Sequence, residues 1–467
     1  RAAAHEGFHS VEHVKRYTTT GMGTDQGKTG NVNALAIVAQ QLGAEIPAVG
    51  VTTFRAPYTP VTFGAITGSH VRGLFDPVRR TPMHDWHVEQ GAKFEDVGQW
   101  KRAWYYPRGE ETMRQAVDRE VKAARDGVGI LDYSTLGKID IRGPDAAEFL
   151  NRVYTNGWKK LGVGRCRYGV MLRDDGMVMD DGVTTRLGEN HFLMTTTTGN
   201  AASVLSWLEE WLQTEWPDLE VYCTSVTEQY ATVSICGPKA RDLLAGLAPD
   251  MTLDPQNFRH MSMQEGTVAG IAARVLRVSF TGEVGFEINV PSRYGRALWD
   301  ALIAEGEPYG ITPYGTEAMH VLRAEKGFFI AGQESDGTVT PLDLGMDWIV
   351  NWTKGDFIGR RSLSRSDTVR DDRKQLVGLF TSDPETVLDE GTQIVATVKD
   401  KPPMDMIGHV TSSYYSPNLG RSIAMAMIQG GRGRKGETLY APMPDKVIEV
   451  TVTDPIFFDP DGQRLNG

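Results

Sequence analysis

The sequence has few of the residues that build disulfide frameworks and no long apolar run that could cross a membrane. Its 467 residues include three cysteines, Cys166, Cys223 and Cys236, which lack CxxC spacing and cannot all pair with one another. No apolar run of about 18 residues occurs, and no basic segment leads into an apolar one as in a signal peptide. We therefore expect no membrane span, and a reducing cytoplasmic location rather than a secreted one.

Positive charge is also scarce. Sixty acidic residues against 49 basic ones give a net charge of −11, which argues against nucleic acid as a partner, because phosphate-backbone binding depends on clustered Lys and Arg. The negative net charge does not exclude small cationic or zwitterionic substrates. The 40% hydrophobic and 23% charged residues are ordinary for a globular chain, and the length predicts two to four domains.

The composition changes along the chain in three stages. Residues 1–78 read as helices, a Gly/Thr-rich loop and a Pro-rich linker, with one helix running from Asn31 as N-cap to about Leu42. Residues 79–372 mix helix and strand patterns, including a helix over about 110–125. Residues 373–467 contain five short strands separated by Gly, Pro and Asp, which predicts a small closed β domain.

Two similar segments indicate an internal repeat. IDIRGPDAAEFL (139–150) and VSICGPKARDLL (233–244) share an alternating strand, a Gly-Pro pair and the start of a helix. Proline suits the first helical position, where its missing N–H is not needed. Two copies 94 residues apart predict two related α+β units packed together rather than a solenoid.

Two motifs in the first 30 residues are weaker than they look. GMGTDQGKT (21–29) ends like a phosphate loop, but the glycine that the motif needs is Met22, and the glycine spacing also fails the dinucleotide fingerprint. His5, His9 and His13 would share one face of a helix, and the opening AAAHEGFHSVEHVKRY reads as the inside of such a helix. No further ligand has matching spacing, so we expect a solvated or subunit-facing stripe and no metal. A chain that opens inside a helix also suggests a fragment or processed piece of a longer protein.

The segment RDDGMVMDDGVTT (173–185) holds two aspartate pairs. The first precedes a glycine and predicts a hairpin turn. The second, Asp180 and Asp181, falls where a strand is expected, and alternation places Met177, Met179 and Asp181 on one face with Asp180 on the other. A carboxylate among methionines is costly to ionise unless something pairs with it. From the residues alone, a structural and a functional role both stay open.

Six blocks spread over residues 80–460 resemble, in order, the glycine cleavage T-protein (aminomethyltransferase) family: TPMHDWHVEQGAKFEDVGQW, DYSTLGKIDIRGPDAAEFL, GMVMDDGV, TGEVGFEINV, PLDLGMDWIVNWTKGDFIGR and TSSYYSPNLGRSIAMAMI. The implied fold is α+β, the aminomethyltransferase folate-binding fold of two related α+β units plus a C-terminal small β-barrel domain. SVEHVKRYTTTGMGTDQGKTGNVNALAIVAQ and the Pro-rich stretch after it resemble the segment before the folate half in α subunits of heterotetrameric sarcosine oxidases.

The resemblance implies roles for particular residues. Asp181 matches the aspartate beside the reactive nitrogens of tetrahydrofolate and would be catalytic. The implied folate-binding residues are Tyr168, Thr197, Phe280, Glu287 and Arg323. Thr197 and Phe280 replace a family asparagine and tyrosine, and Asp132-Tyr133-Ser134-Thr135 replaces Asp-Val-Ser-His. These departures argue against the aminomethyl-lipoyl carrier of the T-protein more than they argue against folate binding.

The resemblance implies the folate-binding part of a sarcosine-oxidase-type oxidoreductase acting on the CH–NH group of N-methyl amino acids. In that family a flavin-containing β subunit oxidises an N-methyl amine, and tetrahydrofolate captures the one-carbon unit as 5,10-methylene-tetrahydrofolate. FAD, FMN and NAD belong to the full hetero-oligomer, with its smaller subunits, and no motif for them lies in this chain. The alternatives are a T-protein-like aminomethyltransferase fed by a lipoyl protein and a folate-binding module without chemistry. The amine itself is not readable from this sequence.

Overall fold

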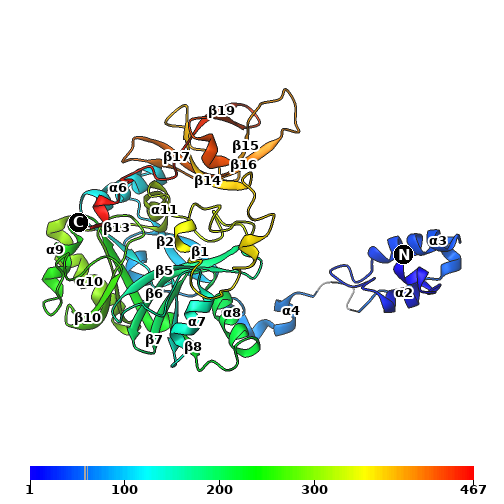
Figure 1. The fold of residues 1–467 in the computed structure, drawn as a ribbon, viewed down its shortest axis with the longest axis horizontal. Helices are drawn as coiled ribbons and strands as arrows, with labels where there is room; N and C mark the ends of the chain where they lie inside the picture. The colour runs from blue at the N-terminus through cyan, green and yellow to red at the C-terminus, as the bar shows by residue number, and fades with distance from the viewer. Residues whose placement is uncertain (57–58, 60, 467) are drawn as a thin grey trace. The chain divides into compact units, whose positions relative to one another are not determined.

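The computed structural model describes residues 1–56, 59 and 61–466, and they divide into two compact units, Arg1–Pro77 and Val78–Gly467 (Figure 1). Part of the predicted Pro-rich linker, residues 57, 58 and 60, lies outside the described residues. Nowhere in the described part is a helix long and apolar enough to cross a membrane. The helices of the first unit are α1 (Ala2–His5), α2 (Val11–Tyr17), α3 (Gly30–Leu42) and α4 (Phe63–Thr67).

The opening of the chain is not one continuous helix, so that prediction is wrong. The chain turns at Gly7, where φ is 93°, and α1 and α2 are separate helices. His5, His9 and His13 therefore do not share a helix face, and the described residues contain no group of His, Cys, Asp and Glu that could hold a metal. Helix α3 starts at Gly30 rather than after Asn31, and ends at Gly43 in the left-handed conformation.

The Gly/Thr-rich loop before α3 is organised by a carboxylate of its own. Asp25 accepts hydrogen bonds from the Thr29 hydroxyl at 2.6 Å and from the backbone N–H groups of Gly27, Thr29 and Gly30 at 2.7–3.1 Å. These bonds, with the Thr29 hydroxyl first, hold the pKa of Asp25 far below its usual range. The loop N–H groups that would cradle a phosphate are thus used by an internal anion.

Two β-sheets form the body of the second unit. The five-stranded sheet has the order β5-β6-β7-β4-β8, and the six-stranded sheet has the order β10-β11-β12-β9-β3-β13. The first consists of β4 (Gly137–Arg142), β5 (Cys166–Leu172), β6 (Val178–Gly188), β7 (His191–Thr196) and β8 (Tyr222–Ser225). The second consists of β3 (Gly129–Asp132), β9 (Tyr230–Cys236), β10 (Ser262–Val268), β11 (Ile271–Arg277), β12 (Gly285–Pro291) and β13 (Thr312–Pro313).

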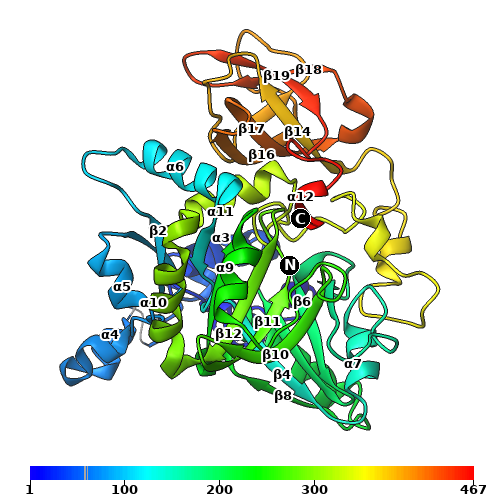
Figure 2. The same ribbon diagram turned by 90° about the vertical axis from the view of Figure 1, so that its left-hand side faces the viewer.

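Helices cover the outer faces of these sheets. Helices α7 (Ala146–Val153) and α8 (Ala201–Thr214) share a core with the five-stranded sheet, while α9 (Ala240–Leu247) and α10 (Gly295–Gly306) share one with the six-stranded sheet (Figures 1 and 2). Full burial of each large apolar side chain in these cores contributes about 1.5–3 kcal/mol. The remaining helices and the small ribbon are α5 (His84–Glu89), α6 (Met113–Asp126), α11 (Thr316–Glu325), α12 (Gln463–Asn466), β1 (Lys93–Val97) and β2 (Trp100–Tyr105).

The predicted repeat is present as β4 followed by α7 and β9 followed by α9. In each copy the strand ends at a glycine with positive φ, 138° at Gly143 and 121° at Gly237. A Cβ would lie 1.9 Å from the Glu220 carbonyl oxygen at the first and 2.3 Å from the Gly127 carbonyl oxygen at the second. The proline after each glycine lies two residues before the helix and not at its first position, because a turn closed by the glycine carbonyl comes first.

The last part of the chain is a closed barrel of six strands, β14-β17-β16-β15-β18-β19. The prediction of five strands missed one, β18, because its short segment follows directly on a Gly-rich turn. The strands are β14 (Lys374–Thr381), β15 (Gln393–Val395), β16 (Met406–Ser416), β17 (Arg421–Gln429), β18 (Thr438–Pro442) and β19 (Val447–Thr453).

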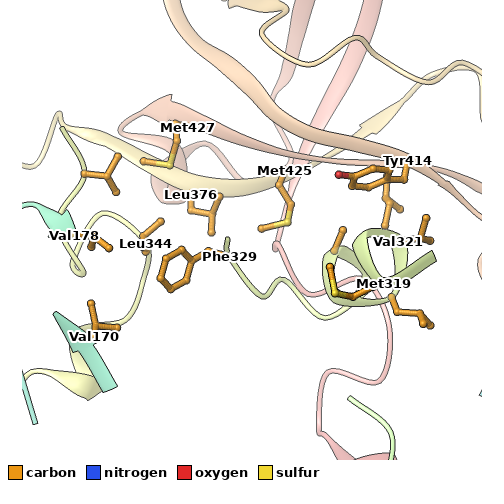
Figure 3. Close-up of a cluster of buried hydrophobic side chains, with 14 of the residues drawn as sticks. Val170, Val178, Met319, Val321, Phe329, Leu344, Leu376, Tyr414, Met425 and Met427 are labelled. Atoms are coloured by element: carbon orange, nitrogen blue, oxygen red, sulfur yellow. The ribbon is translucent and has the colours of Figure 1, made fainter. Parts of the chain in front are cut away.

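A shared hydrophobic cluster joins the barrel to the rest of the unit (Figure 3). Met425 and Tyr414 of the barrel pack toward Met319 of α11, and the same cluster continues through Phe329 to Val170 on β5. One apolar core therefore fixes the barrel, α11 and the β5–β6 hairpin to one another.

Candidate functional site

The β5–β6 hairpin carries the second aspartate pair, and a bulge sets the direction of both carboxylates. Met171 lies opposite Asp180 while Leu172 lies opposite Val178, so Met179 is an extra residue on β6. The prediction that Met179 shares a face with Asp181 is wrong, since the bulge interrupts the alternation there. Asp180 and Asp181 still lie on opposite faces, as predicted.

Asp181 lies beside a tyrosine on the neighbouring strand. The Tyr168 hydroxyl donates a hydrogen bond to its carboxylate at 2.6 Å, and both side chains are partly exposed. Burial raises the pKa of Asp181, while the Tyr168 hydrogen bond lowers it. The structure thus brings together two of the residues that the sequence indicates, as a carboxylate and a hydroxyl that can act on one ligand.

Asp180 is fully buried on the other side of β6. It accepts hydrogen bonds from the Thr197 N–H at 3.2 Å, from the Thr197 hydroxyl, and from the Asn200 side-chain amide at 3.2 Å. Burial, and next the charge of Asp181, raises the pKa of Asp180. Thr197, a predicted folate contact, is therefore placed against Asp180 and not against Asp181.

Glu287 lies on the facing sheet. On β12 it is opposite Leu276 of β11, and Leu276 packs with Cys166 and Val183 of the β5–β6 hairpin. Cys166 and Val183 share the hairpin face of Tyr168 and Asp181. The register therefore directs Glu287 and the Asp181 pair toward the same space between the sheets.

Lys138 is a charged residue that the sequence interpretation missed. It is almost fully buried on β4, and its ammonium donates to the carbonyls of Ser134 and Leu136 at 3.1 and 3.0 Å. Burial lowers its pKa to about 8, against the carboxylate of Glu287. Burial raises the pKa of Glu287 to about 7, and the charge of Lys138 opposes this rise. The lysine within the strand sequence GKIDI is the feature that could have indicated a buried charge at this position.

Phe280 packs against the hydrophobic cluster that joins the barrel, α11 and the β5–β6 hairpin, and Arg323 lies on α11. The Phe280 ring stacks on Phe328 with centroids 6.0 Å apart and packs against the cluster that includes Tyr168. Arg323 is fully buried and donates to the Phe328 carbonyl at 3.0 Å and to Glu334 at 2.9 Å. Arg323 thus holds the backbone behind Phe328, and its contact with folate stays a prediction.

The Asp132–Thr135 segment forms buried hydrogen bonds within the fold. Asp132 lies 3.2 Å from the His87 ring nitrogen Nε2, and the Tyr106 hydroxyl lies 2.9 Å from Nδ1. Thr135, at the position of the family histidine, bonds Thr198 through its hydroxyl at 3.1 Å. The sequence did not indicate this Tyr-His-Asp chain, whose members come from three separate segments.

Comparison with known families matches this architecture over almost the whole chain. The GCVT N-terminal domain matches residues 83–354, and the glycine cleavage T-protein C-terminal barrel domain matches residues 374–459. The chain belongs to the glycine cleavage T-protein family. The sarcosine oxidase A3 domain matches residues 1–70, so the predicted resemblance to both groups is confirmed.

Two relatives of this T-protein family member represent these two groups. Sarcosine oxidase subunit alpha of Corynebacterium sp. (strain P-1) is 56% identical over 465 residues, covering 99% of this chain and 48% of the relative. The chain thus spans about half the length of that relative. An aminomethyltransferase of Chloroherpeton thalassium is 30% identical over 375 residues, covering 80% of this chain and 97% of the relative.

A solved structure supports the fold itself. The crystal structure of the glycine cleavage system aminomethyltransferase T from Bartonella henselae superposes with a TM-score of 0.70, covering 82% of this chain and 99% of that one at 24% identity. The predicted fold class, an aminomethyltransferase fold with a closed C-terminal barrel, is confirmed.

Proposed function

We propose that this chain is the folate-binding part of a sarcosine-oxidase-like enzyme, in which it captures a one-carbon unit as 5,10-methylene-tetrahydrofolate. The observation that carries the proposal is the Tyr168–Asp181 pair on a hairpin face that packs against the sheet of Glu287. The 56% identity to sarcosine oxidase subunit alpha over 99% of the chain supports this choice of enzyme.

The side chains present fit a reduced pterin. No hydrogen bond reaches the Glu287 carboxylate within the described residues, and its raised pKa marks an acceptor short of donors. The paired N–H groups on the edge of a pterin ring are suitable donors, and Phe280 and Tyr168 offer aromatic faces on which such a ring can stack.

The chemistry divides between the two sheets. Tetrahydrofolate, when bound, supplies the amine nitrogens that take up the one-carbon unit. In this proposal Glu287 orients the ring and Asp181 accepts the proton that a nitrogen loses as it attacks, while Tyr168 keeps the Asp181 carboxylate in place. The negative charge of Asp181 also stabilises a cationic iminium beside it.

The proposal extends to the organisation of the enzyme. Residues 1–78 would link the chain to an upstream half, residues 79–372 would hold folate, and residues 373–467 would form the supporting barrel. A flavin-containing β subunit and smaller subunits would complete the complex in the cytoplasm. FAD, FMN and NAD would bind outside this chain, and the flavin subunit would select the N-methyl amine.

A second candidate is an aminomethyltransferase that takes its carbon from a lipoyl protein. The 30% identity over 97% of the length of an aminomethyltransferase favours it. Thr135 and Thr197, which replace a family histidine and asparagine, favour the first proposal, because the lipoyl-borne aminomethyl group would meet a changed site.

Folate binding and turnover in Asp181→Asn test the proposal. Calorimetry with tetrahydrofolate should give dissociation constants for wild type and variant that agree within a fewfold, since Asn keeps the shape and the hydrogen bond from Tyr168. Formation of methylene-tetrahydrofolate from added formaldehyde should slow by about 100-fold or more, as expected when a general base is removed.

Three other outcomes would redirect the proposal. An unchanged rate in Asp181→Asn would remove Asp181 from the chemistry. Turnover with an aminomethyl-lipoyl carrier but not with a flavin partner would favour the second candidate. Folate binding without any turnover in wild type would favour a non-catalytic module.

A further inference from the structure

Lys138 is a buried ammonium whose hydrogen bonding is incomplete. Its side chain is 1% exposed, and its Nζ donates to the carbonyls of Ser134 and Leu136 at 3.1 and 3.0 Å. An ammonium has three N–H donors, and among the residues that the structure describes nothing accepts the third or forms an ion pair with Lys138. Burial lowers the pKa of Lys138 to about 8, so the group is still mainly protonated near pH 7. Burying a charge without its full set of partners is costly.

The strand register places Lys138 on the same face of the sheet as Asp181. Met194 of β7 lies opposite both Ile139 of β4 and Thr184 of β6. Ile139 and Met194 pack in the core that α7 and α8 share, so these three residues take the outer face. Lys138 and Asp181 lie one and three positions away along their strands, so alternation turns both toward the inner face. Their strands are separated by β7 and are therefore about 10 Å apart.

Glu287 lies across the space between the two sheets. Its carboxylate accepts no hydrogen bond within the described part of the chain, and the charge of Lys138 lowers its pKa against the effect of burial. The two groups influence each other in this way, but no ion pair joins them there. The facing sheets thus hold one free ammonium N–H and a carboxylate with both oxygens free, which suits a ligand that presents an acceptor beside two donors.

The amide edge of a pterin has this pattern, because its exocyclic amino group and its ring N–H are followed by the 4-oxo group. We propose that Lys138 is a specificity-determining residue of the folate site: its third N–H donates to the 4-oxo group, while Glu287 accepts from the two donors beside it. The inference rests on the proposed function, and it names the chemical edge by which this chain selects its ligand.

A 4-amino pterin is the ligand that this arrangement should reject. Its amino group would turn a donor toward the ammonium of Lys138, and its ring nitrogen N3 would turn an acceptor toward Glu287. A site built to bond one polar group discriminates strongly against an analogue that cannot make the bond, since the buried partner is then left unpaired. Both side chains should therefore contribute to the preference.

Ligand preference also separates recognition from support of the fold. Lys138 holds the turn that contains Ser134 and Leu136, so its removal could disturb the site as a whole. A disturbed site would bind 4-oxo and 4-amino ligands less tightly by the same factor. Loss of a bond to the 4-oxo group would weaken the 4-oxo ligand alone and reduce the ratio of the two affinities.

Calorimetry with tetrahydrofolate and with tetrahydroaminopterin, its 4-amino counterpart, tests the proposal. Wild type should bind tetrahydrofolate about 100-fold more tightly than the 4-amino ligand. In Lys138→Met this ratio should fall at least about tenfold, mainly through weaker binding of tetrahydrofolate, without disappearing, because Glu287 remains. Lys122→Met, at an exposed lysine of α6, is the matched control and should keep the wild-type ratio.

The possible outcomes keep this inference apart from the proposed function. Equal weakening of both ligands in Lys138→Met would leave Lys138 with a structural role only and overturn the inference. So would equal affinity of wild type for both ligands, and the proposed function would still stand if Asp181→Asn slowed turnover. Wild type that bound neither ligand would end both. If Lys138→Met does not fold, Lys138→Gln decides: its amide can present a donor or an acceptor to position 4, so the ratio should fall, and an unchanged ratio would refute the inference.

Discussion

The two α+β repeats, which contain β4–α7 and β9–α9, hold the carboxylates between their sheets in different ways. In the first repeat, Asp181 follows a bulge in β6 and accepts a hydrogen bond from the Tyr168 hydroxyl. In the second repeat, Glu287 lies on a strand that pairs without a register shift. The charge of Lys138 from the first repeat lowers the pKa of Glu287. The same strand, Gly-Pro turn and helix thus support a carboxylate held by hydrogen bonds and one held by charge.

Changes in the Gly-Pro turn that both repeats share should lower the free energy of unfolding more than the other changes proposed here. Gly143→Ala and Gly237→Ala each add a Cβ against a backbone carbonyl at a positive φ. We expect each to lower the free energy of unfolding by about 3 kcal/mol, measured by urea denaturation. Gly355→Ala, where a Cβ would meet nothing within 4 Å, is the control. A large effect at only one of the two positions would show that the repeats do not depend on their turns alike.

Glu287→Gln should separate binding from turnover. Loss of charge-assisted hydrogen bonds to the pterin should weaken folate binding by about 10–100-fold, or 1.5–3 kcal/mol, while the rate with saturating folate changes little. Calorimetry and the formaldehyde assay measure the two effects. Glu265→Gln, at an exposed glutamate on β10 of the same sheet, should leave both in place. Unchanged affinity in Glu287→Gln would remove Glu287 from the folate site.

The charge of Lys138 should have a smaller, pH-dependent effect. Lys138 holds the pKa of Glu287 below the value that burial alone would give, so Lys138→Met should raise that pKa above about 7. Folate binding that requires ionised Glu287 increases as pH rises through this pKa, and in the variant the increase should come about one unit higher. Calorimetry across this pH range gives the midpoint, with exposed Lys122→Met as the control. If the midpoints of wild type and Lys138→Met coincide, the charge of Lys138 in the first repeat does not influence Glu287 in the second.

Local sequence patterns were enough to predict many of the strands, turns and helix starts. The Asp-Asp-Gly turn, the two Gly-Pro steps and the alternating strands after residue 373 each predict an element that the structure contains, because the cause lies within a few neighbouring residues. The short strand β18 and the break at Gly7 were missed where the local signal was weak.

The details of the candidate site depended on distant partners. The bulge at Met179 arises from pairing with β5 and from the Asp180 contacts with the segment before α8, which alternation within one strand cannot show. Lys138 influences Glu287 from 149 positions away in the chain. Arg323 was assigned by resemblance, and only the folded structure shows that its Nη1 group donates to Glu334 and to the Phe328 carbonyl.

The Arg323 network has a consequence for how the barrel can move. Arg323 on α11 also donates to the Ser412 hydroxyl of barrel strand β16 at 2.6 Å, within the buried ion pair with Glu334. Ser412 in turn donates to Glu334, so moving the barrel away would take this hydroxyl from the buried ion pair and leave buried polar groups without it, at a cost of about 1–3 kcal/mol. The barrel is therefore held against α11 by this network, and we expect a ligand to enter and leave without displacing it.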